Sequence, residues 1–306
     1  MSRHSFGSPP AFGDANFAAV FGVPSAPEQD PSMLNYRGYA LHQAFDLRSR
    51  MAISREKPLV GMFYGAFPHP SVARMIGQAG FDYVILDWEH TPYKLIKVIQ
   101  YAGEGRTAVV VRIPGHDHHF AAWDAGASGV IFPHIQNVEQ AKAAISACRF
   151  PPVGNRSGPP NAMQFGYNDG AAGGGGVFEV WNRAAIILQI EDEEGADNAD
   201  AIAALEEVDG LMLGPGDLAF SLGLTFAEIG KDEKWLSCAS KVATAAENHS
   251  LAYLMPGMGS AQVGLHLQSG VTMTCAANDS MIMAIGLRKE LISAHEQLAV
   301  WKTSKH

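Results

Sequence analysis

Two carboxylates occupy equivalent places in the stretch from Ala185 to Ser221, each just beyond a short apolar run. Glu191 follows the run that ends at Ile190, and Asp217 follows Gly-Pro-Gly after a second run. Such runs, joined by a helical pattern, predict a strand-helix-strand unit with parallel strands buried on both faces. Neighbouring strands lie about 5 Å apart, so the two acids could hold one divalent cation. The alternative is that Glu191 caps the next helix and Asp217 anchors a turn.

Other polar side chains follow the ends of the neighbouring apolar runs. Because parallel strands end at the same edge of a sheet, these side chains should gather on one rim. A guanidinium, two imidazoles, an amide and several acids on one face are difficult to explain as packing alone. The predicted rim residues, besides the two carboxylates, are Asp87, Trp88, Glu89, His90, Arg112, His134 and Gln189.

The chemistry that this set favours is stabilisation of an enolate by a divalent metal. Two carboxylate ligands leave most coordination positions open, which suits Mg²⁺ or Mn²⁺ better than a closed zinc site. A chelated α-keto acid is activated for loss of an α-proton or a neighbouring carbon. Arg112 could bind a carboxylate at two points or neutralise an oxyanion, and His90 is the natural general acid and base. No lysine follows a predicted strand and no Ser or Cys lies in a nucleophile elbow, which disfavours imine or acyl-enzyme mechanisms.

The elements that must position these residues alternate regularly from Pro58 onward. A short apolar run followed by a helical pattern repeats eight times, which is typical of a closed (β/α)8 TIM barrel with its active site at the C-terminal ends of the strands. A doubly wound open sheet is the alternative, but it needs a topological switch and usually has fewer strands. The predicted strands are Leu59–Ala66, Asp82–Asp87, Ala108–Ile113, Gly129–His134, Ala185–Ile190, Gly210–Leu213, Ala252–Met255 and Thr272–Ala276. The predicted helices are Ser71–Gln78, Tyr93–Ala102, His118–Ala125, Val138–Cys148, Asp197–Glu207, Glu233–Asn248, Ala261–Gln268 and Ser280–Trp301.

The predicted domain organisation is an N-terminal extension, residues 1–52, followed by the barrel, residues 53–306. The extension is rich in Pro, Gly, Ser and Asn and shows a helical pattern only at Tyr39–Met51. We expect it to lie over the barrel or a neighbouring subunit.

One long Gly- and Pro-rich segment, Pro151 to Arg183, interrupts the alternation. It is too long for a routine turn, and it leads into the N-terminal end of the fifth strand, away from the expected site. We therefore expect surface roles for its Arg156 and Tyr167.

The composition is that of an ordinary globular enzyme, with 306 residues, 47% hydrophobic and 17% charged. A net charge of −9 disfavours nucleic acid and anionic membranes as partners. No apolar run approaches the ~20 residues of a membrane span. Cys148, Cys238 and Cys275 form no CxxC pair, so we expect reduced core thiols and a cytoplasmic protein.

Six motifs in order along the chain make the sequence resemble the HpcH/HpaI aldolase family, class II metal-dependent pyruvate aldolases that include macrophomate synthase. The resemblance covers roughly Pro58 to the C-terminus and leaves the N-terminal extension outside. The motifs are LDWEH at 86–90, VVVRIP at 109–114, WDAGASGVIFPHIQN at 123–137, FPPVGNRS at 150–157, ILQIED at 187–192 and LGPGDLAFSLG at 213–223.

The resemblance implies a role for each main rim residue. Glu191 and Asp217 would be the ligands of Mg²⁺, with Mn²⁺ or Co²⁺ as alternatives. Gln189 and Arg112 would contact the pyruvate moiety, and His90 would be the acid and base.

Further roles follow from the same resemblance. Asp87 would assist His90 or contact substrate, and the backbone around Gly216 would help to hold the keto-acid carboxylate. Family members also pair the histidine with an acid that corresponds to Asp124. Asp124 ends the third predicted helix, on the far rim, so it could act only from another subunit, which agrees with the hexameric habit (a trimer of dimers) of the family.

The chain departs from the family pattern at three places. Trp88 replaces a small residue, His134 ends the fourth strand, and the glycine run 173–176 is unusual. Trp88 and His134 could shape the pocket for the second substrate. His134 and the long extension favour the macrophomate synthase branch.

Three functions are therefore compatible with the sequence. The leading prediction is a metal-dependent lyase that forms or uses pyruvate enolate, by retro-aldol cleavage of 4-hydroxy-2-oxo acids or by oxaloacetate decarboxylation. The second is a biosynthetic enzyme that adds an oxaloacetate-derived enolate to a cyclic acceptor. The third is a non-catalytic barrel that acts as a binding subunit, which would be expected to have lost one of the predicted ligands.

Overall fold

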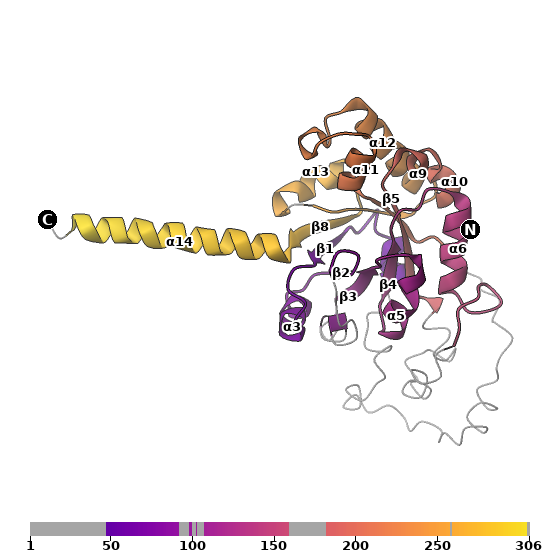
Figure 1. The fold of residues 1–306 in the computed structure, drawn as a ribbon, viewed down its shortest axis with the longest axis horizontal. Coiled ribbons are helices and arrows are strands. Elements are labelled where there is room, and N and C mark those ends of the chain that lie inside the picture. Colours follow the sequence, from indigo (N-terminus) through magenta and orange to yellow (C-terminus); the bar gives the residue numbers. More distant parts are fainter. Residues whose placement is uncertain are drawn as a thin grey trace, which may run out of the picture.

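Eight parallel strands form a closed barrel (Figure 1). The strands pair in chain order, and the first pairs with the last to close the ring. This arrangement confirms the predicted (β/α)8 barrel and excludes the open sheet. The computed structural model describes residues 47–91, 98–99, 102, 107–158, 182–257 and 259–304. The strands are β1 (Leu59–Tyr64), β2 (Tyr83–Asp87), β3 (Ala108–Arg112), β4 (Gly129–Phe132), β5 (Ala185–Ile190), β6 (Gly210–Leu213), β7 (Ala252–Met255) and β8 (Met273–Asn278).

Alternating side chains along the strands build two separate apolar cores. One core fills the barrel interior and includes Tyr83, Ile85 and Ile187. The other lies outside the sheet and includes Val84 and Leu86 together with apolar residues of the helices. Because each strand is buried on both faces, its sequence is nearly continuous in apolar residues, and polar side chains are concentrated at its end.

Helices surround the barrel, and two of them, α6 and α12, have the predicted bounds (Figure 1). The α-helices are α2 (Leu47–Ala52), α3 (Pro70–Gln78), α5 (His119–Asp124), α6 (Val138–Cys148), α9 (Glu193–Asp197), α10 (Ala199–Ala203), α11 (Pro215–Ser221), α12 (Glu233–Asn248), α13 (Val263–Gln268) and α14 (Asp279–Thr303). The described residues also form the short 3-10 helices η3 (His116–His118), η5 (Phe226–Glu228) and η6 (Ser260–Gln262).

Two parts of the helix prediction are wrong. The single helix expected at Asp197–Glu207 is replaced by α9 and α10, because the Asp192 side chain caps a helix that begins at Glu193. The helix α11 was not predicted, although Pro215 occupies its first turn, where a missing amide proton is harmless.

Parts of three other predictions lie outside the described residues. In the predicted helix Tyr93–Ala102, the three described residues are helical. Of the predicted extension, only α2 is described, and residues 1–46 are not. In the Gly- and Pro-rich segment, residues 159–181 are not described, and they include Tyr167 and the glycine run 173–176.

The helix α2 closes the N-terminal end of the barrel. Its Leu47 and Met51 are buried and belong to the interior core. They pack against Gly129 and Gly210, the first residues of β4 and β6, and a side chain at Gly210 would crowd Met51. The opposite, C-terminal end therefore remains the end that can admit a ligand.

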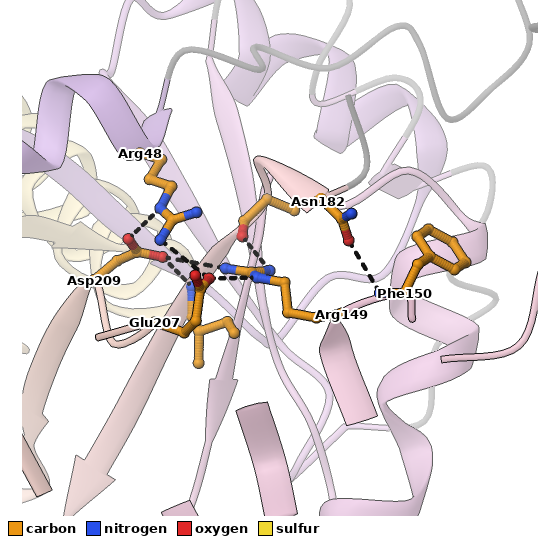
Figure 2. A network of polar contacts seen from close by, with 8 residues as sticks. Arg48, Arg149, Phe150, Asn182, Glu207 and Asp209 are labelled. Atoms are coloured by element: carbon orange, nitrogen blue, oxygen red, sulfur yellow. Dashed lines mark hydrogen bonds and ion pairs between the residues drawn. The ribbon is translucent and has the colours of Figure 1, made fainter. Parts of the chain in front are cut away.

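A charged network ties this closed end to the loop after α6 (Figure 2). Arg149 Nε lies 2.7 Å from a Glu207 oxygen, and Arg48 Nη2 lies 3.2 Å from the same oxygen. Arg48 also pairs with Asp209, whose second oxygen accepts from the Ile186 amide. Burial alone would raise the pKa of the Glu207 carboxyl, but Arg149 and Arg48 hold it below its ordinary value. The network stabilises the fold at the end of the barrel opposite the predicted site.

The helix α14 leaves the barrel and projects away from it (Figure 1). At its start, Asp279 accepts hydrogen bonds from the amides of Gly65, Ala66 and Phe67, which fixes the helix to the loop after β1. Asp279 is its one buried residue. The apolar side chains that the helix exposes are Ile282, Met283, Ile285, Leu287, Leu291, Ile292, Leu298, Val300 and Trp301. Across the described part of the chain, no helix is both long and apolar enough to cross a membrane.

Candidate active site

Arg112 and Asp87 form a bidentate ion pair at the C-terminal ends of β2 and β3. The two residues are register partners, and Arg112 Nε and Nη2 each donate to a different Asp87 oxygen at 2.9 Å. The guanidinium carbon also lies 5.2 Å from the ring centroid of Phe63. Although burial alone would lower the pKa of Arg112, the Asp87 carboxylate raises it. A permanent positive charge is thus held at a fixed place beside the barrel axis.

Glu89 is a second carboxylate on Arg112. It follows Asp87 by two residues, so in an extended chain both side chains point the same way. Glu89 Oε2 lies 3.1 Å from Arg112 Nε and 3.7 Å from His90 Nε2, and Oε1 lies 3.7 Å from His134 Nε2. The sequence places Glu89 on the rim but assigns it no role. The alternation from Asp87 was the signal that could have given it one.

Glu191 is buried directly after β5. It lies at the C-terminal end of the barrel, which we call the mouth. Gln189 donates from Nε2 to Glu191 Oε2. Gln189 is fully buried, and its Oε1 has no hydrogen-bond partner among the described residues. Gly214 lies against the Glu191 carboxylate, and any side chain there would collide with it. The pair therefore presents one unsatisfied amide oxygen and one carboxylate to the mouth.

His134 reaches Glu191 from the end of β4. Its backbone amide donates to Glu191 Oε1 at 2.8 Å, and its ring Nδ1 lies 3.1 Å from the same oxygen. The far side of its ring is near Glu89, and its side chain is 61% exposed. His134 thus lines the open part of the mouth, between the two carboxylates.

Asp217 lies in the first turn of α11 and is exposed. Burial is the main reason that the pKa of Glu191 is raised, and the negative charge of Asp217 raises it further. A cation between the two carboxylates would offset this repulsion. Within the described ranges, no three His, Cys, Asp or Glu side chains form a metal-binding group. A site on Glu191 and Asp217 would therefore leave most coordination positions to substrate and water.

The alternative role for Glu191 as a helix cap is wrong. Asp192, the next residue, caps α9 by accepting from the Gly195 amide. The alternative for Asp217 was a turn anchor, but Asp217 makes no hydrogen bond with any residue that the structure describes. Both carboxylates are thus free of the structural roles that would have explained them.

Three other predicted residues lie around the mouth. The His90 side chain is 62% exposed beside Glu89. The Trp88 ring packs against the outer core and meets the His118 ring edge-on at 5.5 Å between centroids. Gly216 lies in the first turn of α11, close to the Phe226 ring.

Asp124 is at the other end of the barrel. It ends α5, which leads into the N-terminal end of β4, and its carboxylate lies 3.3 Å from Arg156 Nη2. The surface role expected for Arg156 is wrong, because this residue is 2% exposed and its guanidinium stacks on Phe150 at 4.7 Å. Residues after α6 turn back onto the helix, since the amide of Arg156 donates to the Arg149 carbonyl. Asp124 therefore does not join the site within one chain.

Comparisons with known proteins agree with this geometry. A family model described as HpcH/HpaI aldolase/citrate lyase matches residues 60–281. The chain is 36% identical over 185 residues to 4-hydroxy-2-oxovalerate aldolase of Novosphingobium aromaticivorans, covering 58% of this chain and 69% of that protein. It is 33% identical over 187 residues to 5-keto-4-deoxy-D-glucarate aldolase of Enterobacter sp. (strain 638), covering 58% and 70%.

Among solved structures, the crystal structure of macrophomate synthase is similar over nearly its whole length. The TM-score is 0.72 at 26% identity, covering 92% of this chain and 98% of that chain. The matched barrel includes every rim residue described above, from Asp87 to Asp217. The chain belongs to the HpcH/HpaI aldolase/citrate lyase family.

Proposed function

We propose that this protein is a divalent-metal-dependent carbon-carbon lyase that forms or uses the enolate of pyruvate. The observation that carries the proposal is the unsatisfied, fully buried Gln189 oxygen beside Glu191, in the mouth that also holds Arg112. Such a group is costly to bury without a partner. Because an amide oxygen only accepts hydrogen bonds, a bound cation or a water molecule carried by it would supply that partner.

Glu191 and Asp217 are the proposed ligands of the cation, with Mg²⁺ expected and Mn²⁺ or Co²⁺ as alternatives. When bound, the cation supplies Lewis acidity to the keto-acid oxygens. Arg112 neutralises the negative charge that develops on the substrate, since its charge is fixed by Asp87. Gln189 orients the substrate, and the backbone at Gly216 contributes to holding its carboxylate.

His90 moves the protons in this proposal. In a retro-aldol reaction it removes the proton of the 4-hydroxyl group as the bond between C3 and C4 breaks, which gives an aldehyde and pyruvate enolate. It then returns the proton to C3 of the enolate, which gives pyruvate. In oxaloacetate decarboxylation, the breaking bond releases CO₂ and the same enolate takes up a proton.

The relatives support a proposal for the substrate class. Both curated relatives described above are aldolases, one of them of 4-hydroxy-2-oxovalerate. We propose cleavage of 4-hydroxy-2-oxo acids as the main reaction. The likeness to macrophomate synthase over 92% of this chain favours a second candidate, addition of an oxaloacetate-derived enolate to a cyclic acceptor. The three buried free thiols support a cytoplasmic location.

The decisive experiment follows pyruvate release from oxaloacetate by the purified protein, with Mg²⁺ and with a chelator. Release that requires Mg²⁺ is expected, and metal-independent release would contradict the mechanism. No turnover of oxaloacetate or of any 4-hydroxy-2-oxo acid would favour the non-catalytic barrel. A panel of aldehydes and cyclic acceptors, read by product mass, then separates the two enzymatic candidates.

We also propose that the protein is a homo-oligomer, a hexamer built as a trimer of dimers. The support is α14, a 25-residue helix with one buried residue and exposed apolar side chains around it. A surface of this kind marks a protein interface. A second copy fits it, because the barrel helices beside β1 and β8 also expose Met75 and Leu265.

A further inference from the structure

Two acids close to His90 could orient its ring, and they differ in what else they bind. Asp87 uses both carboxylate oxygens on Arg112, at 2.9 Å each, and its side chain is buried. A carboxylate held in this way has its strongest acceptor positions occupied. Asp87 and His90 form no hydrogen bond or ion pair with each other in the described structure.

The position of Glu89 depends on the backbone of its neighbour Trp88 and on the Arg112 side chain. Its neighbour Trp88 donates its amide to the Arg112 carbonyl at 2.9 Å and packs its ring outward against His118. This anchors the segment after β2 and turns Glu89 toward the mouth, on the same side as Asp87. The bulky side chain at position 88 therefore contributes to placing the carboxylate at position 89.

The Glu89 carboxylate lies between one guanidinium and two imidazoles. Arg112 fixes Oε2 at 3.1 Å, and His90 approaches the same oxygen at 3.7 Å. His134 approaches Oε1 at 3.7 Å. Asp87 fixes Arg112, and Arg112 in turn fixes the position of the Glu89 carboxylate. Glu89 is therefore the acid whose fixed position can orient both imidazole rings.

We propose that Glu89 is the positioning residue that orients the His90 imidazole for proton transfer, while Asp87 serves Arg112. The inference rests on the proposed enolate chemistry. Glu89 touches neither the substrate nor the proposed cation in this role. It acts by fixing the direction in which the exposed ring of His90 presents its nitrogen.

The test measures exchange of the pyruvate methyl protons with D₂O by proton NMR, using the Mg²⁺-loaded protein. This reaction needs proton removal by the base and no aldehyde. Glu89→Gln removes the charge without changing the size of the side chain. We expect kcat for exchange to fall about 10- to 100-fold, as part of the 10²–10⁴ contributed by a placed acid-base group. KM for pyruvate should stay within about twofold, since Arg112 keeps Asp87.

Asp87→Asn is the matched control, because it makes the same change two residues earlier. This variant should mainly raise KM for pyruvate, because Arg112 would lose the carboxylate that fixes its position. Glu89→Asp keeps the charge and should recover part of the lost kcat. Exchange by Glu89→Gln at the wild-type kcat, or a raised KM with an unchanged kcat, would overturn the assignment.

A second readout separates this inference from the proposed function. The ring signals of His90 in a ¹H-¹⁵N spectrum, assigned with His90→Asn, should move in Glu89→Gln without any substrate present. If the wild-type protein exchanges no pyruvate protons, the proposed function fails, and this spectrum still decides the role of Glu89. Unmoved His90 signals would overturn it. Unchanged Mn²⁺ affinity and unfolding temperature establish that the variant is folded.

Discussion

The backbone amide and the ring of His134 both contact Glu191 Oε1. The amide nitrogen lies 2.8 Å from this oxygen, and the ring Nδ1 lies 3.1 Å from it. This double contact depends on an unusual backbone, because His134 has a φ of 54°. A residue with a side chain in this left-handed region costs free energy, and such residues are concentrated at functional sites. The backbone conformation that directs His134 toward the proposed metal ligand Glu191 therefore lowers the stability of the fold.

The first prediction tests that strain by unfolding in urea. His134→Gly and His134→Ala both remove the ring, but only alanine keeps the steric cost of a positive φ. We expect the glycine variant to be more stable by about 1 kcal/mol, the reverse of the usual order.

Ser250 provides the control, since it has a φ of 55° in the turn before β7, away from the site. The same order of glycine over alanine is expected there. If the order holds at Ser250 and not at His134, the backbone at His134 is not strained.

The second prediction concerns the cation. Asp217→Ala should abolish Mn²⁺ binding in titration calorimetry, because only two carboxylates are proposed to hold it. Stability should change little, since Asp217 is exposed and makes no hydrogen bond with the described part of the chain. Asp232→Ala is the matched control at another helix start. It removes the cap of α12 and should cost about 1 kcal/mol while leaving Mn²⁺ affinity unchanged.

The barrel and most of its rim could be predicted because of how its strands are buried. A strand such as β3, buried on both faces, allows polar residues only at its end, so Arg112 stands out from three valines. The same reasoning finds Gln189 near the end of β5 and Glu191 directly after it. The loops beyond the strand ends are less constrained, and α11 was missed because Gly-Pro-Gly also fits a turn.

Two errors had a different cause, namely contacts between distant residues. Arg156 lies in a Gly- and Pro-rich stretch that predicts a surface loop, yet Asp124 and Phe150 bury it. The role of Glu89 depends on Arg112, 23 positions further along the chain, and on two histidine rings. Local sequence patterns can give the side of the chain on which a residue such as Glu89 lies, but they do not identify its distant partners.

The third prediction is a pH dependence of stability that arises from Glu207. Its folded-state pKa lies below the ordinary value because Arg149 and Arg48 outweigh the effect of burial. The ionised carboxylate therefore stabilises the fold above about pH 4.3, and this contribution is lost as the pH falls through the folded-state pKa. Glu207→Gln should lower the free energy of unfolding at neutral pH by about 3 kcal/mol.

Urea unfolding between neutral and acidic pH checks this prediction. The difference between wild type and Glu207→Gln should shrink as the pH falls below the unfolded-state value of about 4.3. Glu228→Gln is the control, since hydrogen bonds from Thr225 also lower the pKa of this carboxyl but it is fully exposed. A difference that stays constant with pH would show that Glu207 acts by packing and not by charge.

The fourth prediction concerns assembly through α14. Replacing Ile285 and Leu291 by glutamate should break the assembly into smaller species in sedimentation velocity, because charges cannot be buried unpaired in an apolar interface. Glutamate at Ser293 and Gln297, on the same helix, is the matched control and should be much less disruptive. A wild-type protein that sediments as a monomer would refute the proposed homo-oligomer.

The fifth prediction asks whether Asp124 works from a neighbouring subunit. Within one chain it pairs with Arg156 at the end of the barrel opposite His90. If Asp124 completes the site of another copy, His90→Ala and Asp124→Asn should each be inactive alone. Mixing the two variants with exchange of subunits should restore about a quarter of the sites, because each restored site takes one intact residue from each variant. Activity of Asp124→Asn alone would show that the pair with Arg156 is its whole role, and two inactive variants that fail to complement would place the requirement within one chain.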